Sequence, residues 1–155
     1  IGTYLFSSKK KIQLFFMLDI IACVSPIGIF LGRIANFING ELVGKVTSVP
    51  WSVVFPTFDT LSRHPSQIYE AILEGIILFF ILNKIIFNKI YNMGTCSCMF
   101  LIFYGIFRII SEYFREPDVQ LGYIFNLFSM GTILSFLMTL SGFIMFVFLK
   151  NKNEI

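Results

Sequence analysis

Residues 12–38 read IQLFFMLDIIACVSPIGIFLGRIANFI, and Asp19 and Arg33 are the two charged residues among them. About 20 consecutive apolar residues are enough to cross the hydrocarbon core of a bilayer. Pro26 lies inside this run, and we expect it to kink the helix, which membrane helices tolerate. This stretch therefore predicts a membrane-spanning helix.

Three further apolar stretches follow along the chain: residues 67–86, residues 95–114 and a segment within 119–149 that has no charged residue. Each is long enough to cross a bilayer as a helix. Residues 40–66, between the first two predicted spans, contain three prolines and two glycines, which is typical of a long loop.

The composition indicates the same class of protein. The chain is 56% hydrophobic and 14% charged, whereas about a quarter of the residues of soluble globular domains are charged. Residues 1–6 resemble the end of an earlier helix. We therefore predict an all-α, polytopic transmembrane helical bundle of about four spans plus the tail of an earlier one. Residues 1–155 should form a single membrane domain.

The lysines predict how the bundle is oriented. If each span crosses once, seven of the eight lysines lie on one side of the membrane. Excess lysine and arginine mark the cytoplasmic side. Residues 40–66 and the turn at 115–120 should then face outward. The seven lysines are Lys9, Lys10, Lys11, Lys84, Lys89, Lys150 and Lys152.

The cysteines do not follow the spacing of a metal or redox site. Cys96 and Cys98 are separated by one residue, and Cys23 lies in an apolar run. We interpret all three as packing residues. With one histidine in the chain, neither a metal nor a soluble cofactor is implied, and no nucleic-acid partner is expected.

Polar residues inside the predicted spans are the strongest indication of function. A charge near the bilayer centre costs about 2.5–3.5 kcal/mol, so such residues usually pair or face a cavity. On a helix Arg33, Asn36 and Asn39 share one face. Tyr104 and Arg108 begin a second polar stripe at a spacing of four.

The second stripe continues with Glu112, four residues after Arg108. From the rise of a helix, Arg33 lies about 33 Å beyond the preceding lysines and Arg108 about 20 Å into its span. Both arginines should therefore lie at similar depth in the outer half of the membrane. The simpler alternative is an Arg108–Glu112 pair within one helix that only neutralises charge.

Glu70 and Glu74 open the second predicted span four residues apart, a spacing at which like charges repel. At least one of them should be protonated or paired with an arginine from another span. The simplest interpretation is an interfacial salt bridge that orients the helix.

Two arginines at outer-leaflet depth favour the binding of an anion, because guanidinium groups make bidentate contacts with phosphate. The most abundant anion at that depth is a phospholipid headgroup. Asn36, Asn39, Tyr104 and the nearby carboxylates could hold glycerol hydroxyls. From the residues alone, the hypothesis is an outer-leaflet phospholipid site.

Residues 32–44, GRIANFINGELVG, resemble the signature of the prolipoprotein diacylglyceryl transferases. Residues 63–74 and 104–118 resemble the family's next two blocks, and Leu121-Gly122 and Ser129-Met130-Gly131 continue the match. The resemblance covers essentially the whole chain. The family's His-Gly-Gly stretch precedes the point where this sequence starts.

The resemblance implies an enzyme of the bacterial cytoplasmic (inner) membrane. It would transfer the diacylglyceryl group of phosphatidylglycerol to the lipobox cysteine of a prolipoprotein signal peptide and release glycerol phosphate. Arg33 would bind the lipid phosphate, with Asn36, Glu41 and Gly44 shaping that site. Arg108 would stabilise the departing glycerol phosphate, together with Tyr104 and Glu112.

Two alternatives remain open. The chain could be an inactive or split fragment of such an enzyme that needs its N-terminal half, because the family's histidine is missing from it. It could instead be a transporter or channel, in which membrane charges line an ion path. A transporter predicts charges through the full depth of the bundle.

Overall fold

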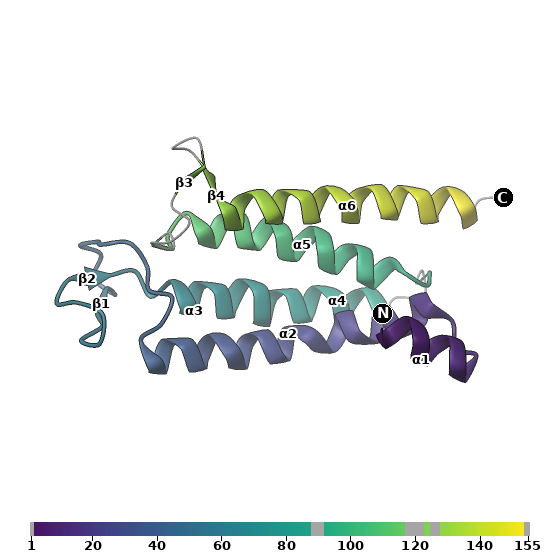
Figure 1. The fold of residues 1–155 in the computed structure, drawn as a ribbon, viewed down its shortest axis with the longest axis horizontal. Coiled ribbons are helices and arrows are strands. Elements are labelled where there is room, and N and C mark those ends of the chain that lie inside the picture. Colours follow the sequence, from purple (N-terminus) through teal and green to yellow (C-terminus); the bar gives the residue numbers. More distant parts are fainter. Residues whose placement is uncertain (1, 88–91, 117–122, 125–127, 154–155) are drawn as a thin grey trace.

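The apolar stretches form long helices that lie side by side in the computed structural model (Figure 1). The structure describes residues 2–87, 92–116, 123–124 and 128–153. The elements in chain order are α1 (Gly2–Lys10), α2 (Leu14–Asn39), β1 (Val53–Val54), β2 (Ser62–Arg63), α3 (Ser66–Glu70), the π-helix η1 (Ala71–Ile77), α4 (Leu78–Phe87), α5 (Thr95–Glu112), β3 (Tyr123–Ile124), β4 (Phe128–Ser129) and α6 (Met130–Asn153).

Three of these helices are long and apolar enough to cross a membrane: Leu14–Asn39, Thr95–Glu112 and Met130–Asn151. They match three of the predicted spans. The second predicted span corresponds to α3, η1 and α4, which follow one another in line beside α2 (Figure 1). The π-helical segment Ala71–Ile77 interrupts this row. A crossing by these residues, and hence the total of four spans, stays a prediction.

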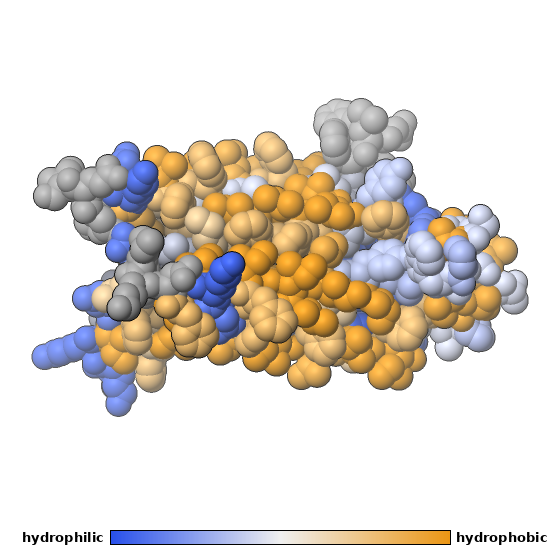
Figure 2. Space-filling view, turned by 180° about the vertical axis from the view of Figure 1, so that it is seen from behind, coloured by the Kyte–Doolittle hydropathy of each residue, from blue (hydrophilic) through white to orange (hydrophobic). Residues whose placement is uncertain are grey.

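The outer surface of the bundle is apolar. Figure 2 shows a broad hydrophobic belt along the helices, with hydrophilic residues at both ends, the most strongly hydrophilic at the end where α1 and the end of α6 lie. Large side chains on this belt are strongly exposed, among them Leu31 at 61%, Phe80 at 66% and Phe148 at 66%. An exposed apolar surface of this extent suits a hydrocarbon environment better than water.

Small residues let the last two helices approach each other closely. A side chain added at Gly105 of α5 would meet Ser135 and Thr139 of α6, and one added at Gly142 would meet Cys98 and Leu101. Close backbone approach at small residues is a common basis of helix association in membranes.

The three cysteines are free and buried, which agrees with their predicted packing role. Cys23 and Cys96 pack with Leu78 and Leu82 between α2, α4 and α5.

The two ends of the bundle differ in structure. The described lysines Lys9, Lys10 and Lys84 lie at the ends of α1 and α4, on the same end as the C-terminus of α6 (Figure 1). The other end carries residues 40–66. Most of this segment is loop as predicted, but it also contains an antiparallel pair in which Val53 faces Arg63. Lys89 and Asp118 lie outside the described residues.

Candidate functional site

The polar residues of the helices meet in one cluster near the loop end of the bundle. We call it the buried ion cluster, and it consists of Arg33 from α2, Glu70 from α3, Glu74 from η1, and Arg108, Ser111 and Glu112 from α5. Glu70 and Glu74 are fully buried, and the side chains of Arg33 and Arg108 are 15% and 11% exposed.

Both glutamates bridge the two arginines. Glu70 Oε2 forms an ion pair with Arg33 Nε at 3.0 Å, and Glu70 Oε1 pairs with Arg108 Nη1. Glu74 lies 3.2 Å from Arg33 Nη2 and 3.7 Å from Arg108 Nη1. The expectation that these carboxylates pair with an arginine from another span is therefore confirmed, with two arginines. The pairs are interhelical and buried inside the bundle.

The same contacts bring Arg33 and Arg108 to one level of the bundle, as their positions along the helices predicted. Arg108 also pairs with Glu112 at 2.9 Å on its own helix. The intrahelical pair thus exists. Arg108 also has partners on other helices, so it does more than neutralise the charge of Glu112. Tyr104, one turn earlier on α5, interacts with Arg33.

Two serines that were not predicted contact the carboxylates of the cluster. Ser111 Oγ lies 3.2 Å from Glu74 Oε1. Ser129 Oγ, at the end of β4 and directly before α6, donates to Glu112 Oε1 at 2.9 Å. Serine spacing gives little signal in a sequence, although Ser111 stands one turn after Arg108 on the polar face of α5.

The cluster contains one more carboxylate than guanidinium. Each arginine nevertheless keeps donors to spare, because a guanidinium has five N–H groups in a planar fork. Arg33 meets Glu70 and Glu74 through Nε and Nη2, so Nη1 is not used by these two pairs. The two glutamate pairs therefore leave N–H donors of Arg33 that no described carboxylate occupies.

The remaining predicted site residues lie farther out. Asn36 is half-buried one turn after Arg33, whereas Asn39 and Glu41 are exposed. Gly40 ends α2 with a φ of 68°, which a glycine adopts without strain. Gln67, which was not predicted, is fully buried and its Nε2 donates to the Glu41 carbonyl at 2.6 Å. This bond ties the end of α2 to the start of α3.

Gly44 lies inside the loop layer, where three segments cross. Its N–H donates to the His64 carbonyl at 3.1 Å, and it forms a bridge with Arg115. A Cβ at this position would lie 2.7 Å from His64 Cβ and 2.9 Å from the Phe114 carbonyl oxygen. The structure therefore gives Gly44 a packing reason for being glycine, and its predicted part in lipid binding stays a prediction.

We expect Gly44→Ala to destabilise the protein by about 1–3 kcal/mol, because the added methyl overpacks this crossing. Gly28→Ala on α2 is the matched control, since nothing lies within 4 Å of a Cβ there. Thermal unfolding in detergent compares the two variants. Equal unfolding temperatures would contradict the packing argument.

Arg63 holds the loop layer together. It donates to Asp59 Oδ2 at 2.6 Å, to the Gly44 carbonyl at 2.9 Å and to Glu116 at 3.2 Å. The hydrogen bond from Arg63 holds the pKa of Asp59 below its ordinary value, and the same bond raises the pKa of Arg63.

Because the folded pKa of Asp59 is lowered, its contribution to stability is present at neutral pH and is lost as the pH falls. We expect Asp59→Asn to lower the unfolding temperature slightly at pH 7. The difference from the unsubstituted protein should shrink below about pH 4, where Asp59 protonates in the unfolded chain. Unfolding curves from pH 7 to pH 3 measure this, and a difference independent of pH would refute it.

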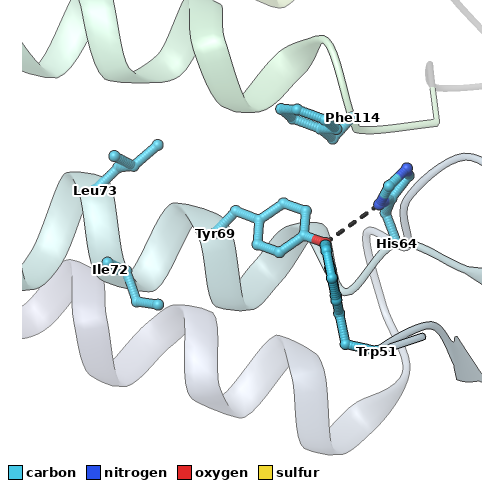
Figure 3. A pocket seen from close by; sticks show the side chains of 6 residues that line it. All are labelled: Trp51, His64, Tyr69, Ile72, Leu73 and Phe114. Carbon is cyan, nitrogen blue, oxygen red and sulfur yellow. Dashed lines mark hydrogen bonds between the residues drawn. The ribbon is translucent and has the colours of Figure 1, made fainter. Parts of the chain in front are cut away.

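An aromatic cavity of about 380 Å³ adjoins the loop layer (Figure 3). Tyr69 Oη accepts a hydrogen bond from Trp51 Nε1 at 2.7 Å and lies 3.2 Å from His64 Nδ1. These contacts, and the edge-to-face packing of His64 on Phe114, indicate a structural role for His64. The lining residues are Trp51, His64, Tyr69, Ile72, Leu73 and Phe114.

Comparison with known proteins identifies what the chain resembles. A family model described as prolipoprotein diacylglyceryl transferase matches residues 1–148. Relatives named phosphatidylglycerol–prolipoprotein diacylglyceryl transferase occur in Rickettsia bellii, with 51% identity over 99% of this chain, and in Rickettsia akari, with 52% identity over 92%. A Rickettsia typhi relative of the same name is 49% identical. The chain spans 58%, 56% and 60% of the lengths of these relatives.

Proposed function

Because the chain belongs to the prolipoprotein diacylglyceryl transferase family, we propose that it supplies the lipid phosphate site of diacylglyceryl transfer. The substrates are phosphatidylglycerol and the lipobox cysteine of a prolipoprotein signal peptide. The observation that supports this most strongly is the meeting of Arg33 and Arg108, from two different helices, in the buried ion cluster.

The reaction is a displacement at the glycerol carbon that carries the phosphate. The cysteine sulfur forms a C–S bond to this carbon, the C–O bond to phosphate breaks, and glycerol phosphate leaves with the electron pair. A free cysteine has a pKa of about 8.5, so the thiol must release its proton before or during the attack.

The arginines serve the two ends of this step. Arg33 binds the phosphate of the lipid through its remaining N–H donors. Arg108, oriented by Glu70 and Glu112, stabilises the negative charge that grows on the departing phosphate. Preorganised donors aimed at developing charge are often the largest catalytic contribution. The carboxylates fix both guanidinium groups before the lipid enters.

The distribution of charge supports this function over ion transport. The charged groups that α2, η1 and α5 bury gather in the ion cluster, except for Asp19, which bonds to the backbone at the start of α5. Such an arrangement leaves no ladder of charged groups through the depth of the described helices. We also propose that the lysine-rich end is cytoplasmic in the inner membrane, so that the cluster lies toward the outer leaflet.

The test reconstitutes the chain in phosphatidylglycerol liposomes with a lipobox peptide, with and without the N-terminal part of a related enzyme. Mass spectrometry follows the thioether-linked diacylglyceryl peptide. Product from the chain alone supports the proposal and makes the chain sufficient. Product only with the added part supports it as one portion of a divided catalyst. A folded, inserted protein that gives no product in either mixture refutes it.

A further inference from the structure

Helix α5 begins without a capping side chain of its own. Its N-cap residue, Gly94, has a φ of 93° and makes no side-chain cap hydrogen bond. The first N–H groups of a helix have no partner within it, and a buried helix start needs acceptors from elsewhere. Here the acceptor comes from another helix, 75 residues earlier in the chain.

Asp19 of α2 supplies both of its oxygens to this helix start. Oδ2 accepts the Gly94 N–H at 2.6 Å, and Oδ1 accepts the Ser97 N–H at 2.8 Å and the Ser97 hydroxyl at 2.7 Å. Asp19 is 1% exposed. A carboxylate at a helix N-terminus is also favoured by the helix dipole. These three hydrogen bonds form what we call the α2–α5 clamp.

The clamp is at the same distance from both arginines. Asp19 precedes Arg33 by the same number of residues as Gly94 precedes Arg108, which corresponds to about 21 Å on each helix. Both helices run in the same direction from the clamp (Figure 1). Aligning the two starting points therefore aligns the two guanidinium groups on Glu70 and Glu74.

Apolar packing alone would fix this alignment poorly. The contacts between α2, α4 and α5 around Cys23, Leu82 and Cys96 are mainly hydrophobic, with one weak hydrogen bond from Cys96 Sγ to the Leu82 carbonyl at 3.8 Å. Hydrophobic attraction has no direction. Hydrogen bonds depend steeply on distance and angle. The clamp thus adds charge-assisted, directional contacts between α2 and α5 to a core that is mainly apolar.

We propose that Asp19 is a positioning residue that sets the axial register of α2 and α5, and through it the relative placement of Arg33 and Arg108. Its effect on turnover rests on the proposed function, whereas its effect on register does not. A misplacement of about 1 Å can cost about 10²-fold in rate. Asp19 lies about 21 Å along the helices from the arginines, so we place its effect on turnover in the arginines.

Three variants test the clamp. Asp19→Asn keeps the size but turns an NH2 group toward one of the donors. Ser97→Ala removes one hydrogen bond of the three. Ser25→Ala is the control, because Ser25 Oγ bonds to the Ile21 carbonyl of its own helix.

Two measurements are made on each variant. The first is the distance between spin labels at Ile38→Cys and Ile110→Cys, two exposed positions on α2 and α5. The second is kcat and KM for phosphatidylglycerol, measured in whichever reconstituted mixture gives product, the chain alone or the chain with the N-terminal part of a related enzyme.

We expect Asp19→Asn to shift or broaden the label distance and to lower kcat by about 10²-fold with little change in KM. Ser97→Ala should lower kcat by about fivefold, as expected for one hydrogen bond. An Asp19→Asn protein with the unsubstituted label distance, or one with a shifted distance and full kcat, overturns the proposal. If Asp19→Asn fails to insert, Ser97→Ala is the deciding variant. A Ser97→Ala protein with the same label distance and the same kcat as Ser25→Ala also overturns the proposal.

The distance measurement separates this inference from the proposed function. If the unsubstituted protein shows no transfer, the proposed function fails, and the label distances still decide whether Asp19 sets the register.

Discussion

Replacing Arg108 with alanine is expected to lower kcat for diacylglyceryl transfer by about 10²- to 10³-fold, the usual cost of removing one donor to developing charge. The phosphate oxygen becomes more negative as the C–O bond breaks. Arg108 is held by Glu70, Glu74 and Glu112, so its position does not depend on the substrate. The loss should therefore fall mainly on kcat.

The alanine variant also removes the cation from three carboxylates, so activity must be separated from folding. Arg108→Lys serves this purpose, because it keeps the charge but loses the planar fork. We expect it to stay inserted and still lose much of the activity. Lys45→Ala is the control for net charge. It removes a cation outside the ion cluster, since Lys45 bonds to the Tyr113 carbonyl.

The assay uses the reconstituted mixture that gives product, with unfolding temperatures recorded for each variant. A well-folded Arg108→Lys or Arg108→Ala protein with the turnover of Lys45→Ala would rule out the assigned role of Arg108. An unchanged kcat with a raised KM would instead assign Arg108 to binding of the lipid before reaction.

The main helices were predictable because their signal is local. An apolar run of bilayer length indicates a span wherever it occurs, and α2, α5 and α6 follow their runs closely. The common level of Arg33 and Arg108 along the bundle was predictable for the same reason, since helical rise converts residue number into distance. The repulsion between Glu70 and Glu74 predicted that at least one of them is protonated or paired with an arginine from another span, and the ion cluster contains two such arginines.

The unpredicted features depend on contacts between distant segments. Nothing in the spacing of Asp19 indicates that its partners are the N–H groups of Gly94 and Ser97. The π-helical turn at Ala71–Ile77 likewise has no marker in its composition. A Cβ at Gly75 would lie 2.7 Å from Phe30 Cβ, so the close packing of η1 on α2 depends on a glycine at this position. In the sequence alone, this glycine indicates only a weak helix former.

The π-helical segment has a consequence for the site. Segments of this kind inside α-helices often occur at functional positions. Here the segment carries Glu74, which contacts both arginines and Ser111. Stability and proposed catalysis therefore depend on the same side chains, and a change in a carboxylate should affect both.

Glu70→Ala is expected to give the largest loss of stability, about 3–5 kcal/mol, because removing one partner leaves buried charges uncompensated. Glu70 is fully buried and contacts Arg33 Nε and Arg108 Nη1, so its loss affects two guanidinium groups at once. Glu70→Gln keeps the shape and one acceptor, and it leaves two carboxylates facing two arginines. We expect its stability to lie between those of Glu70→Ala and the unsubstituted protein.

Equilibrium unfolding in detergent measures this order, with Glu41→Ala as the control that removes an exposed carboxylate. A Glu70→Ala protein within about 1 kcal/mol of the control would mean that the arginines find other partners or water, as surface ion pairs do. The cluster would then be solvated and could not hold its guanidinium groups in place before the lipid enters. The predicted order of stabilities instead requires that water is excluded from the two arginines and that the carboxylates hold them in place. Stabilisation of a departing phosphate requires the same arrangement.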